Sequence, residues 1–239
     1  MWKARSHLRA TRGDLLDEFD RLPQDKRGKV LEASIKEFAE KGYTNASTNA
    51  IVREAGVSKG LLFHYFRSKR DLYLAALDYC LNVQMDYFLQ NARLRYPSDI
   101  IERVIEWGAL KLEMVYRFPL MHRLLLNVLL EMPSEVRSEV EKRFAAITQR
   151  SWQLFLQGVD LSQLRDGIDK RKAVELLVVA MEGLQRKYVD QYKDRPGDLI
   201  AGADKVFEEV KQYMEILKYG LYRPEGVGAE RHGSPSDPV

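Results

Sequence analysis

Apolar residues recur along most of the chain at the three- and four-residue spacing of amphipathic helices. No sustained stretch alternates apolar and polar residues with the β-branched and aromatic content that a sheet requires. Hydrophobic residues make up 45% of the 239 positions, enough for the core of one large domain or two of ordinary size. The pattern therefore predicts an all-α protein.

The expected long helices are separated by glycine or proline. They lie at residues 23–41, 69–95, 98–117, 119–131, 134–157, 170–193 and 203–219. The breaks between them fall at Gly42, Pro97, Pro119, Pro133, residues 158–167 and Pro196-Gly197. Residues 1–22 form an N-terminal extension, either a flexible arm or an extra helix. Residues 221–239 are rich in Gly, Pro and Ser, and this composition predicts a disordered tail.

Two short helices are expected between the first two long ones, joined by a turn that contains glycine. Ser47 or Thr48 caps the first short helix, Gly56 ends it, and Ser58 caps the second. Their apolar positions are Ile51, Val52, Ala55, Val57, Leu62 and Phe66. This arrangement predicts a helix-turn-helix over residues 47–66, which places its second helix in the major groove of DNA. The pattern alone also fits a helical hairpin that never meets DNA.

Charge is distributed unevenly along the chain. Residues 1–70 carry a net charge of +6, whereas residues 71–239 carry −3. A basic N-terminal third is typical of a part that binds a polyanion. The basic residues Lys3 to Arg12 suggest an arm that reaches an adjacent minor groove, and a solvated tail explains them equally well.

The sequence around the turn resembles a known family. The residues concerned are Gly42-Tyr43 and the run IVREAGVSKGLLFHYFRSK at positions 51–69. They are similar to the DNA-binding domain of the tetracycline-repressor (TetR) family. The resemblance covers residues 25–70, and the later helices agree with the family in number, length and order. It implies a three-helix DNA-binding domain over residues 23–70. It also implies an all-α domain over residues 71–220 that binds a small effector and dimerises through its last two helices.

The resemblance implies which residues contact the operator. Those at the start of the first short helix contact the DNA backbone or nearby bases, those of the second form the reading face, and one lysine binds a phosphate. The expected DNA-binding residues are Ser47, Thr48, Asn49, Ser58, Lys59, Gly60, Leu61, His64, Tyr65 and Lys69. Two positions depart from the family pattern, because Ala46 replaces a frequent Thr and Phe63 a common Tyr. Each removes a hydroxyl that could bind phosphate.

Aromatic and methionine side chains in the middle of the chain can line an adaptable apolar pocket or fill an ordinary core. The candidate pocket residues are Trp107, Leu110, Met114, Phe118, Met121, His122, Leu125, Phe144, Trp152 and Phe155. His122 has no second ligand at helical spacing, so a metal site is not expected.

The last two long helices carry broad apolar stripes that can pack against a partner as well as against the chain's own core. The candidate dimer-interface residues are Val174, Val178, Met181, Val206, Val210, Tyr213, Met214 and Leu217. With the resemblance added, a two-fold homodimer is expected, because the operators of helix-turn-helix dimers mirror the symmetry of the protein.

The remaining sequence features concern redox chemistry, cellular location and catalysis. Cys80 is the single cysteine, which excludes an intramolecular disulfide and favours a buried thiol over a redox sensor. No signal peptide and no membrane-spanning run is recognised, and a cytoplasmic location is expected. No Ser-His-Asp neighbourhood, phosphate-binding Gly loop or Glu-x-x-His motif is visible, so neither an enzyme nor a cofactor is expected.

The prediction is therefore a one-component regulator, expected to be a repressor, that binds a palindromic duplex operator as a dimer. A small, largely apolar effector releases it, and the helix at residues 69–95 is the expected lever between the two parts. One alternative is a DNA-binding accessory protein that senses nothing, which a solidly packed body would favour. The other, an all-α enzyme, is the weakest.

Overall fold

The computed structural model describes residues 22, 24–95, 97–130 and 132–220. Helices make up the regular structure of these residues, with no strand among them, which confirms the all-α prediction. The predictions of an N-terminal arm and a disordered tail concern residues 1–21 and 221–239, which lie outside the described part of the chain.

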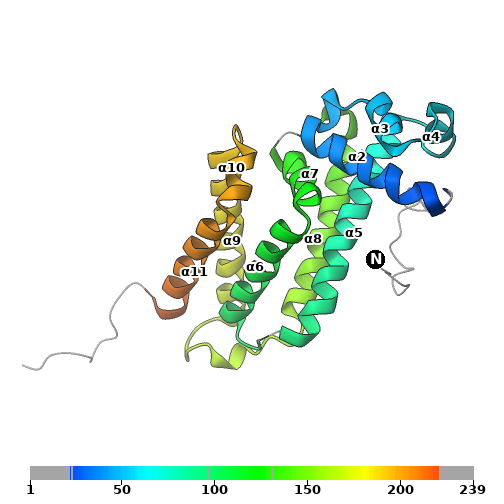
Figure 1. Ribbon diagram of the computed structural model, residues 1–239. Coiled ribbons are helices and arrows are strands. Elements are labelled where there is room, and N and C mark those ends of the chain that lie inside the picture. The colour runs from blue at the N-terminus through cyan, green and yellow to red at the C-terminus, as the bar shows by residue number, and fades with distance from the viewer. Residues whose placement is uncertain (1–21, 23, 96, 131, 221–239) are drawn as a thin grey trace, which may run out of the picture.

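Three helices form a compact unit at one end of the molecule (Figure 1). They are α2 (Gln24–Asn45), α3 (Thr48–Ala55) and α4 (Lys59–Tyr65). Within α2, Gly42 has φ 67° and ψ 175°, a conformation that favours glycine and interrupts the regular helix at the predicted position. Gly56 ends α3 with φ 65° and ψ 35°, also as predicted.

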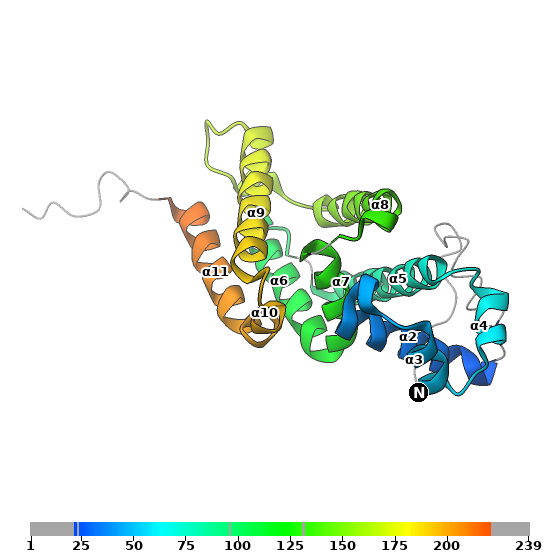
Figure 2. The ribbon, with the colours of Figure 1, turned by 90° about the horizontal axis from the view of Figure 1, so that it is seen from above.

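The remaining helices extend away from this unit. They are α5 (Lys69–Arg95), α6 (Ile100–Arg117), α7 (Pro119–Leu130), α8 (Arg137–Leu156), α9 (Lys170–Tyr192), α10 (Pro196–Ala201) and α11 (Ala203–Tyr219), with single 3-10 turns η1 (Ser134–Val136) and η2 (Leu161–Gln163). In the view from above, α6 and α7 lie between the α2–α4 unit and helices α9–α11 (Figure 2). None of the helices in the described part of the chain is long and apolar enough to cross a membrane.

The expected long helices are confirmed, with ends that differ by up to four residues. The helix break predicted at Pro196-Gly197 is wrong, because Pro196 is the first residue of a short helix, α10. Proline has no N–H group to lose at the first position of a helix and its fixed φ suits that position.

The first hydrophobic core joins the α2–α4 unit to the rest of the chain. Phe38 of α2, Ile51 of α3 and Leu62 of α4 are buried together with Leu77 of α5 and Val128 of α7. Asn127 adds a hydrogen bond from its side-chain Nδ2 to the backbone oxygen of Ala39, with a length of 2.9 Å. This core crosses the predicted domain boundary at residue 70, so α5 and α7 are physically continuous with the α2–α4 unit.

A second core lies at the other end of α5, where three aromatic rings meet. Phe88 stacks on Trp107 with centroids 4.9 Å apart, and Trp107 meets the edge of Phe155 at 5.4 Å. Met214 of α11 is fully buried in this cluster. Gly108 allows close packing of α6 and α11, since a Cβ there would lie 2.8 Å from the Phe207 ring. The two cores are therefore connected by the long helix α5.

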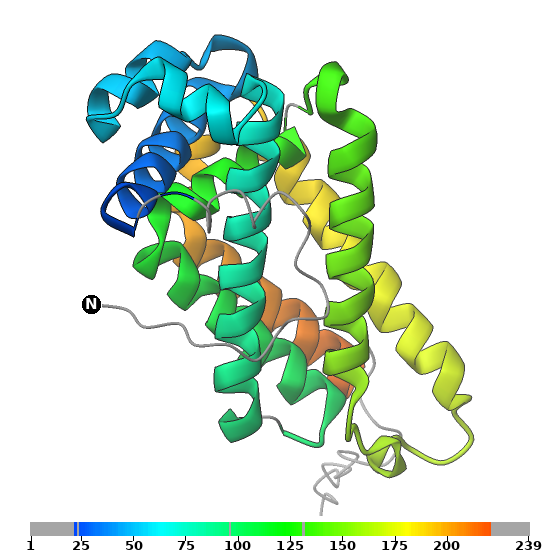
Figure 3. The same cartoon turned by 90° about the vertical axis from the view of Figure 1, so that its right-hand side faces the viewer.

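Helices α5 and α8 lie side by side (Figure 3) and are joined by ion pairs. Arg143 donates to both carboxylate oxygens of the buried Asp78, at 2.7 and 3.1 Å. Glu139, which lies one helical turn before Arg143 on α8, accepts a hydrogen bond from Arg70 of α5. Because a bidentate pair requires both partners in one orientation, these contacts fix the register of α8 on α5.

Arg103 connects the two loops at the far end of the second core. Its side chain is 2% exposed and its guanidinium donates to four backbone oxygens. The acceptors are Pro97, Phe155, Gln157 and Gly158, at 2.6 to 3.3 Å. The start of α6 is thereby tied to the end of α8.

Candidate DNA-binding surface and ligand pocket

The geometry of α3 and α4 is set by capping residues and a small core. Ser47 caps α3 by accepting a hydrogen bond from the N–H of Ala50, and Ser58 caps α4 by accepting from the N–H of Leu61 at 3.1 Å. Ile51 and Leu62 are 1% exposed and fix the two helices against α2. The structure thus forms the predicted helix-turn-helix.

The outer face of α4 consists of small, polar and aromatic side chains. Lys59, Gly60 and His64 are exposed, while Leu61 and Tyr65 are half-buried. The rings of His64 and Tyr65 meet edge to face with centroids 5.0 Å apart. Apart from its chain neighbours and the backbone of its own helix, no heavy atom lies within 4 Å of the position where a Cβ of Gly60 would be. This face leaves polar side chains and an open strip of backbone accessible to solvent.

The start of α3 offers fewer free groups than the sequence suggests. The Ser47 N–H already donates to Glu37 Oε1 at 2.8 Å, so only the hydroxyl hydrogen of Ser47 remains to bind a phosphate. Asn49 is exposed and Thr48 is half-buried. Ion pairing between Lys36 and Glu54 across 2.8 Å ties α3 to α2 beside them.

Lys69 has a structural contact that the sequence does not reveal. Its ammonium donates to the Thr44 backbone oxygen at 2.9 Å and lies 5.0 Å from the centre of the Tyr43 ring. Lys69 therefore joins the start of α5 to the end of α2. Its predicted phosphate contact has to use the remaining donors of the same ammonium.

The two departures from the family pattern have different structural meanings. Ala46 is buried, so the missing hydroxyl removes no exposed donor at that position. Phe63 is half-buried, and the Lys59 ammonium lies 5.9 Å from the centre of its ring. Phe63 therefore positions the Lys59 side chain through a cation–π contact.

Five of the ten predicted pocket residues meet around one small cavity between α5, α6 and α7. Its lining comprises Cys80, Val83, Gln84, Met114, Phe118, Met121, His122 and Leu125. The free volume is only about 10 Å³, the space of a single water molecule. Burial raises the pKa of the Cys80 thiol, which favours its interpretation as a structural residue rather than a redox sensor.

The other five predicted pocket residues pack elsewhere. Leu110, Trp107 and Phe155 are buried in the second core, and Trp152 packs against it. Phe144 packs against the first core. These residues contribute to the cores in this structure, and their role in lining a ligand pocket stays a prediction.

A larger opening lies where the end of α8 meets the start of α9. This groove of about 750 Å³ is lined by Leu156, Val159, Leu161, Lys170, Arg171, Val174 and Glu175. Sequence reasoning missed it except for Val174, which was assigned to the dimer interface. The apolar residues on both sides of Gly158 were the only available signal.

The predicted dimer residues divide into internal and external ones. Met214 is 0% exposed and packs in the chain's own second core, which leaves none of its side chain on the surface of the single chain. Four others pack partly against that core: Val174, Met181, Val210 and Tyr213. Val178 and Val206 are half-buried and Leu217 is exposed. The exposed apolar residues on the last helices that the sequence did not single out are Leu176, Val179, Ile216 and Tyr219.

Comparison with known proteins agrees with this geometry. Residues 30–76 match the family described as bacterial regulatory proteins, tetR family. The fatty acid metabolism regulator protein of Bacillus subtilis is 23% identical over 185 residues, which span 75% of this chain and 90% of that protein. The transcriptional activator FasR of Mycolicibacterium smegmatis is 46% identical over 59 residues, 24% of this chain and 27% of that protein.

Solved structures show the same fold over most of the chain. The regulator FadR from Bacillus subtilis, in complex with stearoyl-CoA, aligns with a TM-score of 0.57 and 18% identity, covering 82% of this chain and all of that one. A TetR-like regulator from Rhodococcus sp. RHA1 aligns with a TM-score of 0.59 and 18% identity, covering 84% of this chain and all of that one. Residues 30–76 therefore form a domain of the tetR family of bacterial regulatory proteins, and the relatives and structural neighbours named above are transcriptional regulators.

Proposed function

We propose that this protein is a ligand-responsive transcriptional repressor that binds a palindromic duplex operator as a homodimer. Residues 23–70 are the DNA-reading part and residues 71–220 the effector-binding and dimerising part. The observation that carries the proposal is the continuous core that joins the helix-turn-helix to the wall of the α5–α7 pocket. The sensing and reading parts are therefore mechanically connected.

The reading element in this proposal is α4. Its exposed Lys59 can donate to a guanine edge or a phosphate, and Gly60 allows the backbone to approach the groove. The hydroxyl of Ser47 and the side chain of Asn49 lie at the start of α3, where helix-turn-helix proteins bind the DNA backbone. Two such units must lie about 34 Å apart to read successive turns of one DNA face.

The dimer surface in this proposal is formed by α9 and α11. These helices contact each other through Lys187, whose ammonium donates to Glu209 and, at 3.2 Å, to Tyr213. Leu176 and Val179 on α9 are 58% and 55% exposed, and Ile216 of α11 is also exposed. Exposed apolar side chains on adjacent helices suit a two-fold interface that pairs them with a second copy.

Introducing charge into this surface is expected to separate the subunits. Leu176→Glu places a carboxylate in the interface, where it has no partner and resists desolvation. Light scattering should then give the mass of the 27.7 kDa chain instead of twice that mass. Leu129→Glu, an equivalent change at a 40% exposed leucine of α7, is the matched control and should remain dimeric. A monomeric wild-type protein would rule out this surface as a dimer interface.

The effector in this proposal is a small molecule with a long apolar part. The pocket is lined by Met114, Phe118, Met121 and Leu125. Bound ligands of this kind usually occupy about 300–1,000 Å³, so the present 10 Å³ must expand on binding. The relatives support a fatty-acyl compound, since one is named a fatty acid metabolism regulator and one structure contains stearoyl-CoA.

Helix α7 provides a route from the pocket to the DNA-reading part. Met121 and His122 line the pocket, whereas Leu124 and Val128 are buried in the first core and Asn127 bonds to α2. A ligand that enlarges the pocket displaces α7 and disturbs these contacts. It then favours a state in which the two reading helices no longer match successive grooves. Both α7 and the predicted lever α5 take part, because α5 lines the same pocket.

The proposal is tested by titrating a fluorescent operator complex with stearoyl-CoA and following anisotropy. Typical coupling between ligand and DNA sites predicts that saturating ligand weakens operator binding by about 5- to 150-fold. Free CoA is the matched control and should have little effect, because it lacks the apolar chain. Unchanged affinity with stearoyl-CoA and with a panel of other apolar compounds would instead support a DNA-binding protein without an effector.

A further inference from the structure

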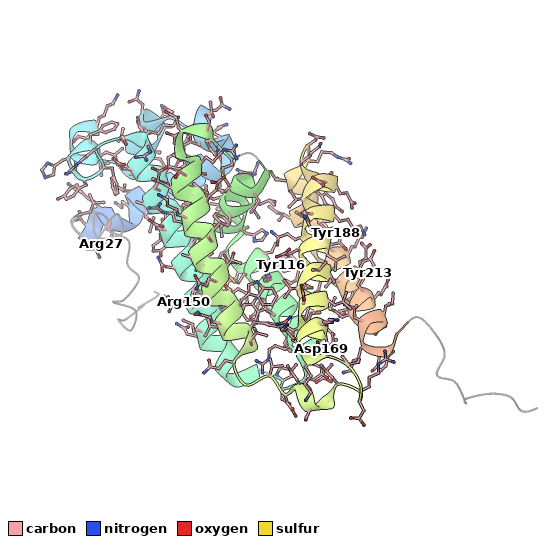
Figure 4. All side chains as sticks on the ribbon, turned by 180° about the vertical axis from the view of Figure 1, so that it is seen from behind. Arg27, Tyr116, Arg150, Asp169, Tyr188 and Tyr213 are labelled. Carbon is pink, nitrogen blue, oxygen red and sulfur yellow. The ribbon has the colours of Figure 1, made fainter. Side chains whose placement is uncertain are left out.

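Lys111 is the only lysine of α6, and it lies on the inward face of that helix. It comes four residues after Trp107 and three before Met114, both of which are buried, and residues at these spacings share a helix face. Lys111 is nevertheless accessible to solvent. Seen from behind, α8 and α9 lie in front of α6, whose Tyr116 is labelled (Figure 4). Lys111 therefore shares a helix face with two buried residues and is itself exposed.

The ammonium of Lys111 has no protein counterion. Among the described residues it forms no hydrogen bond and no ion pair, whereas Lys187 and Lys218 each contact a carboxylate. The surrounding protein lowers the pKa of Lys111, and no neighbouring carboxylate opposes that effect. An exposed ammonium without a carboxylate partner keeps its three donors available for an anionic ligand. Such a group is typical of a site that a ligand completes.

A second nitrogen-bearing side chain lies beside the lysine. His122 of α7 lines the small pocket together with Met114, the residue one turn after Lys111. Burial lowers the pKa of His122, and the positive charge of Lys111 lowers it further. The two side chains are therefore close enough to interact electrostatically. Neutral His122 can still donate one ring N–H to an anion.

We propose that Lys111, with His122 beside it, binds the anionic group of the effector at the edge of the α5–α7 pocket. The anion is a carboxylate or a phosphate, and the apolar remainder of the ligand lies against Met114, Phe118 and Met121. This inference rests on the proposed effector function and defines its ligand class as amphipathic anions. Lys111 is a specificity-determining residue that neither the helical pattern nor the family resemblance indicated.

The test compares three twelve-carbon probes: laurate, lauroyl-CoA and the uncharged dodecanol. Binding to the full-length protein is measured by calorimetry and tryptophan fluorescence, with thermal unfolding as a check of folding. Lys111→Gln is expected to weaken binding of one or both anionic probes by about 10- to 100-fold, the usual range for a lost charge-assisted hydrogen bond. It should change dodecanol binding less than about twofold, since the alcohol has no charge to lose. Lys111→Arg should retain most of the affinity.

The matched control is Lys142→Gln, which removes an exposed lysine of α8 and should leave all three affinities unchanged. A loss with laurate identifies a carboxylate site, and a loss with lauroyl-CoA alone identifies a phosphate site. Equal binding of the anionic probes to wild type and Lys111→Gln overturns the inference, as does an equal loss with dodecanol. If dodecanol releases the operator while the lysine has no effect, the effector function stands without this site. If no probe binds the wild type, the inference is overturned together with the fatty-acyl proposal.

Discussion

Replacing Arg103 by methionine should lower the free energy of unfolding by about 3–5 kcal/mol. The guanidinium makes five hydrogen bonds to four backbone oxygens and is 2% exposed. Methionine fills a similar volume but donates nothing, so buried carbonyl groups of both loops lose their partners. Urea unfolding followed by circular dichroism measures the change. The loops that end α5 and α8 would then no longer be tied to α6.

The control for this change is Arg137→Met in the first turn of α8. Arg137 is exposed and its pair with Glu141 spans 3.7 Å at the surface. Such a pair contributes at most about 1 kcal/mol. If the free energy of unfolding of the Arg103 variant also fell by less than about 1 kcal/mol, water would have replaced the guanidinium easily. Arg103 would then be a minor contact rather than the connection between two loops.

Gly60→Ala is expected to weaken operator binding at least about tenfold without harming the fold. The added methyl group meets no protein atom within 4 Å, and alanine favours a helix more than glycine does. The methyl group would, however, project from the exposed face of α4, where close approach of the backbone to DNA leaves little room. Operator anisotropy and thermal unfolding together separate these two effects.

Gly28→Ala in α2 is the matched control, because Gly28 is also exposed and a Cβ there meets no heavy atom within 4 Å. It should leave operator affinity unchanged. Normal operator affinity of Gly60→Ala would mean that α4 does not approach a groove closely at this position. The reading face would then have to be assigned to other residues of the helix-turn-helix.

Local signals were sufficient to predict the DNA-reading part of the fold. Ser47 and Ser58 cap their helices and Gly56 ends α3 as the sequence indicated. These features depend on side chains only a few residues apart, so one sequence reveals them. The identity of the residues at the DNA surface stays a prediction, although Lys59 and His64 are exposed as required.

The body was less predictable because its important contacts are between distant residues. Arg103 is separated from its acceptors at Phe155 and Gln157 by 52 and 54 positions, so a charged residue there gave no sign of burial. Met114 and Phe155 have the same apolar character, yet only Met114 lines the small pocket. The continuity of the first core across residue 70 also depends on α7, which is distant from residue 70 in the sequence.

The most direct test of the central claim is selection of bound duplexes from a random DNA pool, with the stoichiometry of the selected complex measured by light scattering. We predict a two-fold symmetric sequence whose half-site centres lie about 34 Å, or a multiple of that distance, apart and which binds two chains. An asymmetric site bound by a single chain would contradict this account, as would the absence of any enriched sequence.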